Sequence, residues 1–252
     1  MRGVRPTLLM AGSLLASAAV PPVGSAYARA SACSTVPAGA VTRPGPSGAW
    51  RAEIDARTPV FDAMPAGGGR PSRWLTPRDA PWLLVLSSPR AAHGSCWLHV
   101  RLPRRPNAAA GWVEAGKVFV QQTPWRITIS RGRRTLTVYR AGAPVRTMRV
   151  VVGKPSTPTP GGRFAVVWAI RWHPRDFLGS WVLELTAHSA ALSRFDGGDG
   201  TVGIHGRGGS SLRDPLGSAL SHGCIRLSNE SIEWLVRTIG GKRLPGTPVT
   251  IS

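Results

Sequence analysis

The sequence predicts a mostly β chain, with a small N-terminal β-barrel followed by a larger β domain that carries one packed helix. Short apolar runs separated by turn residues recur along the chain, and several alternate with polar positions as half-buried strands do. Helical periodicity appears convincingly in one segment only, residues 228–239. A length of 252 residues suits one large or two small domains. We therefore divide the chain into residues 1–30, 31–49, 50–122 and 123–252.

Residues 1–30 have the organisation of a secretory signal peptide. Two arginines form a positive start without acids, an apolar run follows, and small residues around Ala28 offer a cleavage site. The run has about 14 residues, fewer than the roughly 20 of a spanning helix, which disfavours an uncleaved anchor. A lipid anchor on Cys33 is a further alternative. We expect an exported protein at the cell wall or the extracellular face of the cytoplasmic membrane, without a transmembrane segment after signal removal.

Residues 31–49 and 50–122 precede the larger domain. The first stretch is rich in Ser, Ala, Pro and Gly and predicts a flexible leader. The second has short apolar stretches without helical periodicity, which predicts a small β-barrel. Its residues 97–113, with the pattern Trp-Leu-x-Val-x-Leu-Pro, then Pro-Asn, then Gly-Trp-Val, resemble bacterial Src-homology-three-like domains that accompany wall enzymes. The resemblance implies wall binding, and a packing spacer is the alternative.

Residues 123–252 contain a second set of strands around one helix. Strands are predicted at residues 127–129, 135–139, 145–152, 163–170 and 247–251. The loop 153–162 is proline-rich, so we expect it on the surface, unable to pair in a sheet. Residues 171–200 are the least regular and predict a lid beside a site. In residues 228–239 apolar positions recur at helical spacing, with Ser228 or Asn229 as the cap.

The formal net charge of +20 favours an anionic partner. The arginines are scattered, and no basic helix or nucleic-acid motif accompanies them. We therefore expect an anionic cell envelope as the partner and no nucleic acid.

The three cysteines single out Cys224. In an exported protein thiols tend to pair, and the economical arrangement is a disulfide between Cys33 and Cys96 with Cys224 free. A cysteine thiol loses its proton more readily beside a histidine or near a helix N-terminus. Both aids are near Cys224 in sequence, so the sequence predicts a nucleophile suited to acyl transfer through a thioester.

Two other interpretations of this region remain open. Cys224 is an inert buried thiol in the first, with His205 and His222 as ordinary polar residues. In the second, His205, His222 and Cys224 bind zinc, since two imidazoles and a thiolate can hold that metal. The Cys-x-x-Cys and His-Glu-x-x-His spacings of familiar zinc sites are absent from the sequence. We accordingly predict no metal and no cofactor.

The residues around Cys224 carry a family resemblance. Ile204-His205-Gly206, a gap of fourteen residues and then residues 221–227 (Ser-His-Gly-Cys-Ile-Arg-Leu) resemble the signature of the L,D-transpeptidase (YkuD-type) catalytic domain. Residues 135–139, 152–161 and 246–251 match further stretches of that family in order. The resemblance covers roughly residues 125–252 and implies a β-sandwich with one packed helix.

The resemblance also implies an activity, that of a cysteine-dependent acyltransferase in peptidoglycan biosynthesis, which organises the cell wall and cell shape. Cys224 would attack a tetrapeptide stem before its terminal D-alanine, and an amine of a second stem would resolve the thioester into a 3→3 cross-link. An L,D-carboxypeptidase that uses water instead, and an inactive wall-binding protein, are the alternatives.

Site roles follow by position from the same resemblance. His205 is the base, with His222 as the rival, and the Gly206 carbonyl orients the His205 imidazole. Backbone N–H groups of His222, Gly223 and Cys224 form the oxyanion hole. Ser221 and Arg226 are expected to bind substrate, Arg226 through a carboxylate, and a structural ion pair is the alternative for Arg226.

Overall fold

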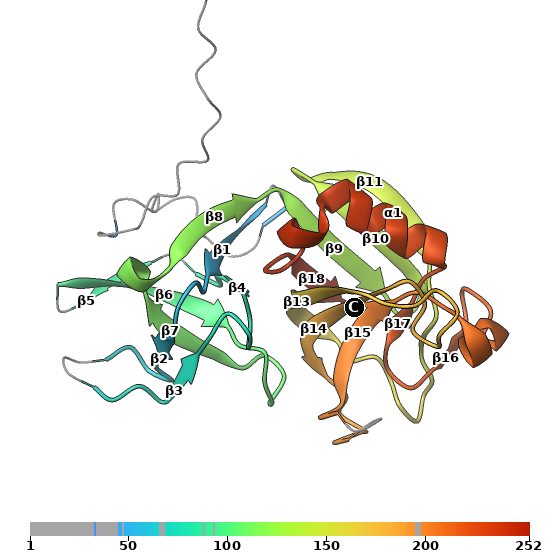
Figure 1. Ribbon diagram of the computed structural model, residues 1–252, viewed down its shortest axis with the longest axis horizontal. Coiled ribbons are helices and arrows are strands. Elements are labelled where there is room, and N and C mark those ends of the chain that lie inside the picture. The colour runs from blue at the N-terminus through green and yellow to red at the C-terminus, as the bar shows by residue number, and fades with distance from the viewer. Residues whose placement is uncertain are drawn as a thin grey trace, which may run out of the picture.

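The structure is a computed structural model that describes residues 33, 45–46, 48–65, 69–87, 89–92, 94–194 and 198–252. The predicted signal peptide and nearly all of the predicted leader lie outside these residues. Figure 1 shows two mostly β halves side by side, strands β1 to β8 in one and strands β9 to β18 with helix α1 in the other.

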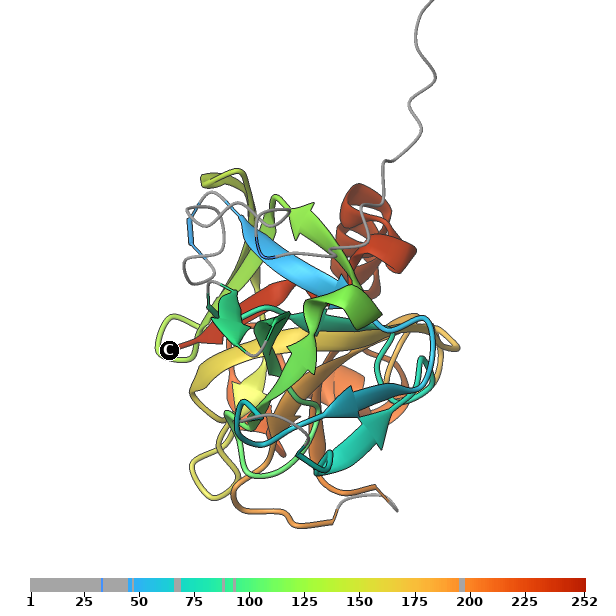
Figure 2. The same ribbon diagram turned by 90° about the vertical axis from the view of Figure 1, so that its left-hand side faces the viewer.

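The N-terminal half consists of eight short strands. They are β1 (Ala49–Glu53), β2 (Thr58–Val60), β3 (Arg73–Leu75), β4 (Trp82–Leu84), β5 (Arg90–Ala92), β6 (Ser95–Arg101), β7 (Ala110–Glu114) and β8 (Phe119–Thr123). They pair as β4-β1-β8, β5-β6-β7 and β2-β3, and Figure 2 faces this half. A shared apolar core joins the three small sheets. Cys33 is joined to Cys96 in a disulfide.

The larger half is built on an eight-stranded sheet of order β11-β10-β9-β18-β13-β14-β15-β17. Strands β12 and β16 form a separate parallel pair. The strands of this half are β9 (Trp125–Ser130), β10 (Thr135–Arg140), β11 (Ala143–Arg149), β12 (Val152–Gly153), β13 (Gly162–Arg171), β14 (Trp181–His188), β15 (Thr201–His205), β16 (Ala219–Ser221), β17 (Ile225–Arg226) and β18 (Pro248–Ile251). Every strand predicted in this half is present, with ends shifted by a few residues.

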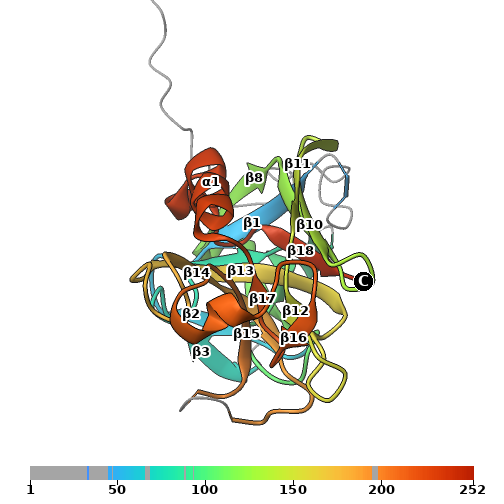
Figure 3. The ribbon, with the colours of Figure 1, turned by 90° about the vertical axis from the view of Figure 1, so that its right-hand side faces the viewer.

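Helix α1 (Asn229–Ile239) covers one face of this sheet, as Figure 3 shows. Ser228 caps it, because the Ser228 hydroxyl accepts a hydrogen bond from the Ser231 N–H. The buried side of the helix presents Ile232, Leu235, Val236 and Ile239 to the core of this half. The predicted helix is therefore confirmed. Within the described residues no helix combines the length and the apolar character that crossing a membrane requires.

Two sequence expectations need correction. Residues 171–200 do not form one irregular lid, because strand β14 runs through their middle between β13 and β15. The proline-rich loop after β12 does not lie wholly on the surface. Thr157, Thr159 and Pro160 are buried in it, since their side chains fill space beneath the turn that precedes β17.

The two halves share core side chains and a buried arginine. Val167 and Trp168 of β13 pack against the apolar core of the N-terminal half. Arg51 of β1 is buried and donates from Nη1 to the carbonyl oxygens of Arg243 and Pro245, at 2.8 Å each. Its guanidinium carbon lies 4.0 Å from the ring centre of Trp82. The contact therefore stabilises the junction between the halves through buried, charge-assisted hydrogen bonds.

Replacing Arg51 by Met is expected to lower the free energy of unfolding by about 2 kcal/mol, because two carbonyl groups lose their charged donor. Arg57→Met is the matched control, since Arg57 is exposed and lies over the ring of Trp74. The control is expected to change stability by less than about 0.5 kcal/mol. Denaturant unfolding followed by tryptophan fluorescence measures both, and equal losses would contradict this account of the junction.

Candidate active site

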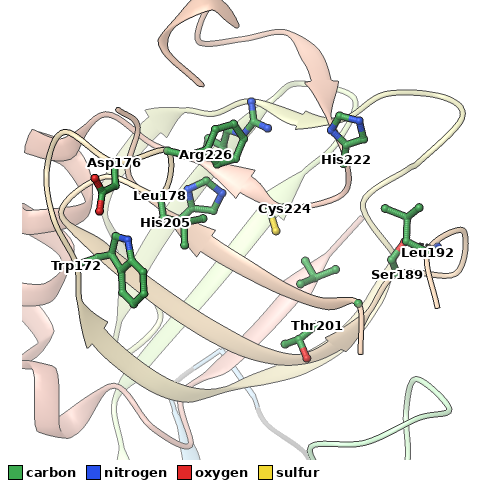
Figure 4. A pocket seen from close by; sticks show the side chains of 13 residues that line it. Trp172, Asp176, Leu178, Ser189, Leu192, Thr201, His205, His222, Cys224 and Arg226 are labelled. Carbon is green, nitrogen blue, oxygen red and sulfur yellow. Dashed lines mark hydrogen bonds between the residues drawn. The ribbon is translucent and has the colours of Figure 1, made fainter. Parts of the chain in front are cut away.

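A cavity of about 490 Å³ brings the predicted nucleophile and the predicted base together. Its lining residues are Trp172, Asp176, Phe177, Leu178, Ser189, Leu192, Gly200, Thr201, Val202, His205, His222, Cys224 and Arg226. Figure 4 shows the sulfur of Cys224 and the imidazole of His205 at this hollow. The lining combines apolar side chains with a few polar groups, as small-molecule and peptide sites do.

Strand register brings these side chains close together. β15 and β17 run parallel, with His205 paired to Arg226. Cys224 directly precedes β17, and its side chain lines the same cavity as those of His205 and Arg226. The pairing thus brings His205 close to a turn that follows it by almost twenty positions in the sequence.

His205 is buried and has a defined tautomer. Its Nδ1 lies 2.7 Å from the carbonyl oxygen of Gly206, which can only accept, so Nδ1 carries the hydrogen. Burial lowers the pKa of His205 to about 4, with help from the positive charge of Arg226 and against hydrogen bonding to the backbone of Gly206 and of Leu178. The imidazole is therefore neutral near pH 7, with a lone pair on Nε2. That nitrogen is buried and forms no hydrogen bond of ordinary geometry with any described residue.

Cys224 is the free thiol of the chain and lies at the cavity, partly exposed. Burial raises the pKa of the Cys224 thiol, and this outweighs the backbone amide of Gly203 and the charge of Arg226, which lower it. The sequence expectation of an acidified thiol is therefore wrong in direction. Strand β17 separates Cys224 from the start of α1, and the surroundings of the sulfur favour the neutral form.

His222 is placed differently from His205. Its side chain is exposed, and its Nε2 lies 3.4 Å from Nζ of Lys154. In Figure 4 the imidazoles of His205 and His222 lie on opposite sides of Cys224, and the His222 ring points away from the sulfur. Both residues line the cavity, but His205 is buried whereas His222 is exposed.

The turn that carries Cys224 is closed by Ser221. The Ser221 hydroxyl donates to the carbonyl oxygen of Cys224 at 2.6 Å and accepts from the N–H of Gly223 at 3.1 Å. Ser221 is fully buried and its hydroxyl bonds twice within the turn, so the structure shows a role in holding the turn, and substrate binding by Ser221 stays a prediction. The Gly223 N–H donates to the same hydroxyl, and its part in an oxyanion hole stays a prediction. Gly223 adopts φ +123°, a conformation that favours glycine.

The loop after β12 supports this turn from below. The Thr159 hydroxyl accepts from the N–H of Gly153 and donates to the carbonyl oxygen of Gly223, both at 2.8 Å. The Thr157 hydroxyl donates to the carbonyl oxygen of Ser221 at 3.3 Å. Sequence reasoning singled out this loop by family resemblance but missed the roles of its threonines, since their partners lie about 64 residues away.

Asn229 fixes the wall of the cavity next to His205. Its Oδ1 accepts from the N–H groups of Ser180 and Arg207, and its Nδ2 donates to the carbonyl oxygen of Pro174. A Cβ on Gly206 would lie 2.2 Å from Oδ1 of Asn229, so only glycine allows this approach. The sequence offered Asn229 as a helix cap; the structure gives that role to Ser228 and makes Asn229 a link between three segments.

Arg226 is held on two sides. Its Nη1 forms an ion pair with Asp214, and its guanidinium carbon lies 4.7 Å from the ring centre of Phe177. The structure therefore contains the ion pair considered as the alternative role. Arg226 also lines the cavity, so a contact with a substrate carboxylate stays a prediction. The described residues contain no group of three His, Cys, Asp or Glu side chains that could hold a metal ion.

The chain was compared with known protein families, and one family model matches the half that contains this site. The model of the L,D-transpeptidase catalytic domain, YkuD, matches residues 124–251. The chain belongs to this family. L,D-transpeptidase YkuD of Bacillus licheniformis is 30% identical over 155 residues, 58% of this chain and 84% of the relative. YkuD of Bacillus subtilis is 30% identical over 129 residues, 51% of this chain and 66% of the relative.

Solved structures of L,D-transpeptidases are also similar to this chain. One from Enterococcus faecium is 22% identical, with a TM-score of 0.38, over 51% of this chain and 50% of that one. One from Mycobacterium tuberculosis is 16% identical, with a TM-score of 0.43, over 80% of this chain and 94% of that one. The chain thus spans about half of the Enterococcus faecium protein.

In this L,D-transpeptidase domain, Thr159→Val is expected to lower the free energy of unfolding by about 2 kcal/mol, because a buried N–H and a buried carbonyl lose their partner. Thr137→Val is the control, since the Thr137 hydroxyl pairs with Thr147 at the surface. Denaturant unfolding measures both. A loss for Thr159→Val no larger than that of the control would contradict the supporting role of the loop.

Proposed function

We propose that the protein is a peptidoglycan L,D-transpeptidase that forms 3→3 cross-links through a thioester on Cys224. One observation carries the proposal. The free thiol and a buried, neutral imidazole whose Nε2 forms no hydrogen bond of ordinary geometry with a described residue line one cavity. The Cys224 thiol and the His205 imidazole can both be neutral before the reaction, because the imidazole takes the thiol proton while the sulfur attacks.

In the acylation step, the sulfur of Cys224 bonds to the carbonyl carbon between residue three of a tetrapeptide stem and its terminal D-alanine. The thiol proton passes to Nε2 of His205. The Cys224 N–H is the donor that we assign to the developing oxyanion. The C–N bond then breaks, His205 returns the proton to the amine of D-alanine, and D-alanine leaves a thioester behind.

In the second step the side-chain amine of residue three of another stem attacks the thioester. The amine gives a proton to His205, a C–N bond forms and the C–S bond breaks. The sulfur then recovers its proton from His205, which restores the starting state. Water in place of the amine would give the L,D-carboxypeptidase reaction through the same thioester.

The walls of the cavity suit the end of a peptide stem. The charge of Arg226 lies at the cavity and attracts a carboxylate such as that of D-alanine, although Asp214 offsets part of that charge. Phe177 and Leu178 also line the cavity, and the ring of Phe177 lies 4.7 Å from the guanidinium carbon of Arg226 and 6.2 Å from the ring of His205, centre to centre.

We also propose export to the cell wall, with the N-terminal half as a Src-homology-three-like barrel that contacts the wall. The Cys33–Cys96 disulfide supports export, since such bonds persist in oxidising compartments. Single bridges that link strands of different small sheets, Val85 to Val100 and Phe61 to Trp112, support a barrel-like arrangement. The net charge of +20 supports an anionic partner.

Incubation of the full chain with a tetrapeptide stem is expected to release D-alanine and to give a cross-linked dimer, detected by mass spectrometry. Cys224→Ala is expected to abolish both products, because the thioester cannot form. His205→Asn is expected to slow the reaction by about 10² to 10⁴-fold, the usual contribution of a general base.

His222→Asn is the matched control for His205→Asn and is expected to retain turnover within about tenfold, a loss well below that of a missing base. Tripeptide without dimer would contradict transpeptidation and establish the carboxypeptidase reaction. Dimer formation by Cys224→Ala would contradict the nucleophile assignment.

A further inference from the structure

One rim of the active-site cavity is built from two chain segments that meet beyond the ends of β14 and β15. The segments are residues 188–192 and 199–201, and four of their members (Ser189, Leu192, Gly200 and Thr201) line the cavity. We refer to these two segments together as the distal rim.

The distal rim is connected within itself. The Ser189 N–H donates to the carbonyl oxygen of Gly200 at 2.8 Å. His188 Nε2 lies 3.0 Å from Oδ2 of Asp199, and Oδ1 of Asp199 accepts from the N–H and the hydroxyl of Thr201. The bonds from Ser189 to Gly200 and from His188 to Asp199 join the two segments.

The N-terminal half holds the distal rim through the loop between β6 and β7. Arg105 donates from Nη2 to the carbonyl oxygens of Leu192 and Asp199, each at 2.9 Å, and from Nε to Asp199 at 3.3 Å. Asn107 forms a reciprocal pair with the backbone of His188: its Nδ2 donates to the carbonyl oxygen and its Oδ1 accepts from the N–H, both at 2.8 Å. In Figure 1 this loop extends toward the ends of β14 and β15.

The approach between the loop and the rim is close. A Cβ on Gly200 would lie 2.2 Å from the carbonyl oxygen of Leu192 and 2.9 Å from Nη2 of Arg105. The two carbonyl groups face one guanidinium, whose planar fork bonds both at once. Arg105 is exposed, whereas the Asn107 pair is part-buried, so water competes more strongly with the Arg105 bonds.

We propose that Arg105 and Asn107 are positioning residues for the active site, through which the N-terminal half fixes the distal rim and thereby the binding of the donor stem. The proposal rests on the proposed function for the nature of the substrate only. Neither residue lines the cavity, so neither is assigned contact with the stem. The N-terminal half would then act on binding of the donor stem, through the distal rim, and not only as a wall anchor or a spacer.

The test compares Asn107→Ala and Arg105→Met with the full wild-type chain. Asn107→Ala is expected to raise KM for the tetrapeptide stem about tenfold, equivalent to about 1.4 kcal/mol, with kcat within about twofold. Arg105→Met is expected to act in the same direction and less strongly. Both variants are expected to speed amide hydrogen exchange at Ser189, Leu192 and Thr201, whose N–H groups bond within the distal rim.

Arg104→Met is the matched control, because Arg104 lies in the same loop but pairs with Asp62 of the N-terminal half. It is expected to match the wild type in exchange and in KM. Alkylation of Cys224 by iodoacetamide is expected to be unchanged in all variants, since the small reagent does not need the rim.

Unchanged exchange at the distal rim in Asn107→Ala and Arg105→Met would overturn the proposal, as would equal effects of Arg104→Met. Faster exchange with an unchanged KM would also overturn it, because the rim would then not bind the stem. If the wild type shows no turnover of stems, the proposed function fails. In that event the exchange data still decide whether the loop holds the rim.

Discussion

The hydrogen bond from Nδ1 of His205 to the carbonyl oxygen of Gly206 determines what the site can do. It fixes the ring orientation and places the hydrogen on Nδ1, so the lone pair of the neutral imidazole is on Nε2. Gly206 keeps this position because Asn229 packs where a Cβ would lie. A helix residue, a strand end and a backbone carbonyl thus combine to fix the ring of His205 and to leave the lone pair on Nε2.

Burial also determines whether His205 and Cys224 are charged before a substrate binds. It lowers the pKa of His205 and raises that of Cys224, so both groups are neutral near pH 7. A neutral pair costs less to bury than an ion pair. In the proposed reaction the proton moves from the thiol to His205 as the sulfur attacks. The turn carrying Cys224 is held by hydrogen bonds from the side chains of Ser221 and Thr159.

Features that depend on residues close together in the sequence could be predicted from the sequence. The helix follows from apolar spacing and Ser228, and Cys224 and His205 follow from the motif. The direction of the Cys224 pKa could not be predicted, because burial depends on how distant strands pack. The bonds from Arg105 and Asn107 to the rim join residues about 80 to 90 positions apart and leave no periodic trace in the sequence. Strand β14 was missed because glycines and charges flank its apolar centre.

The central claim, a neutral thiol beside a neutral imidazole, is tested most directly by ultraviolet absorbance of the thiolate. Cys224 is the free thiol, so the difference between the wild type and Cys224→Ala reports on it alone. The account predicts no thiolate absorbance at pH 7 and its appearance only above the ordinary cysteine pKa of about 8.5. Thiolate absorbance at pH 7 that disappears in His205→Asn would show a thiolate–imidazolium pair and contradict the account.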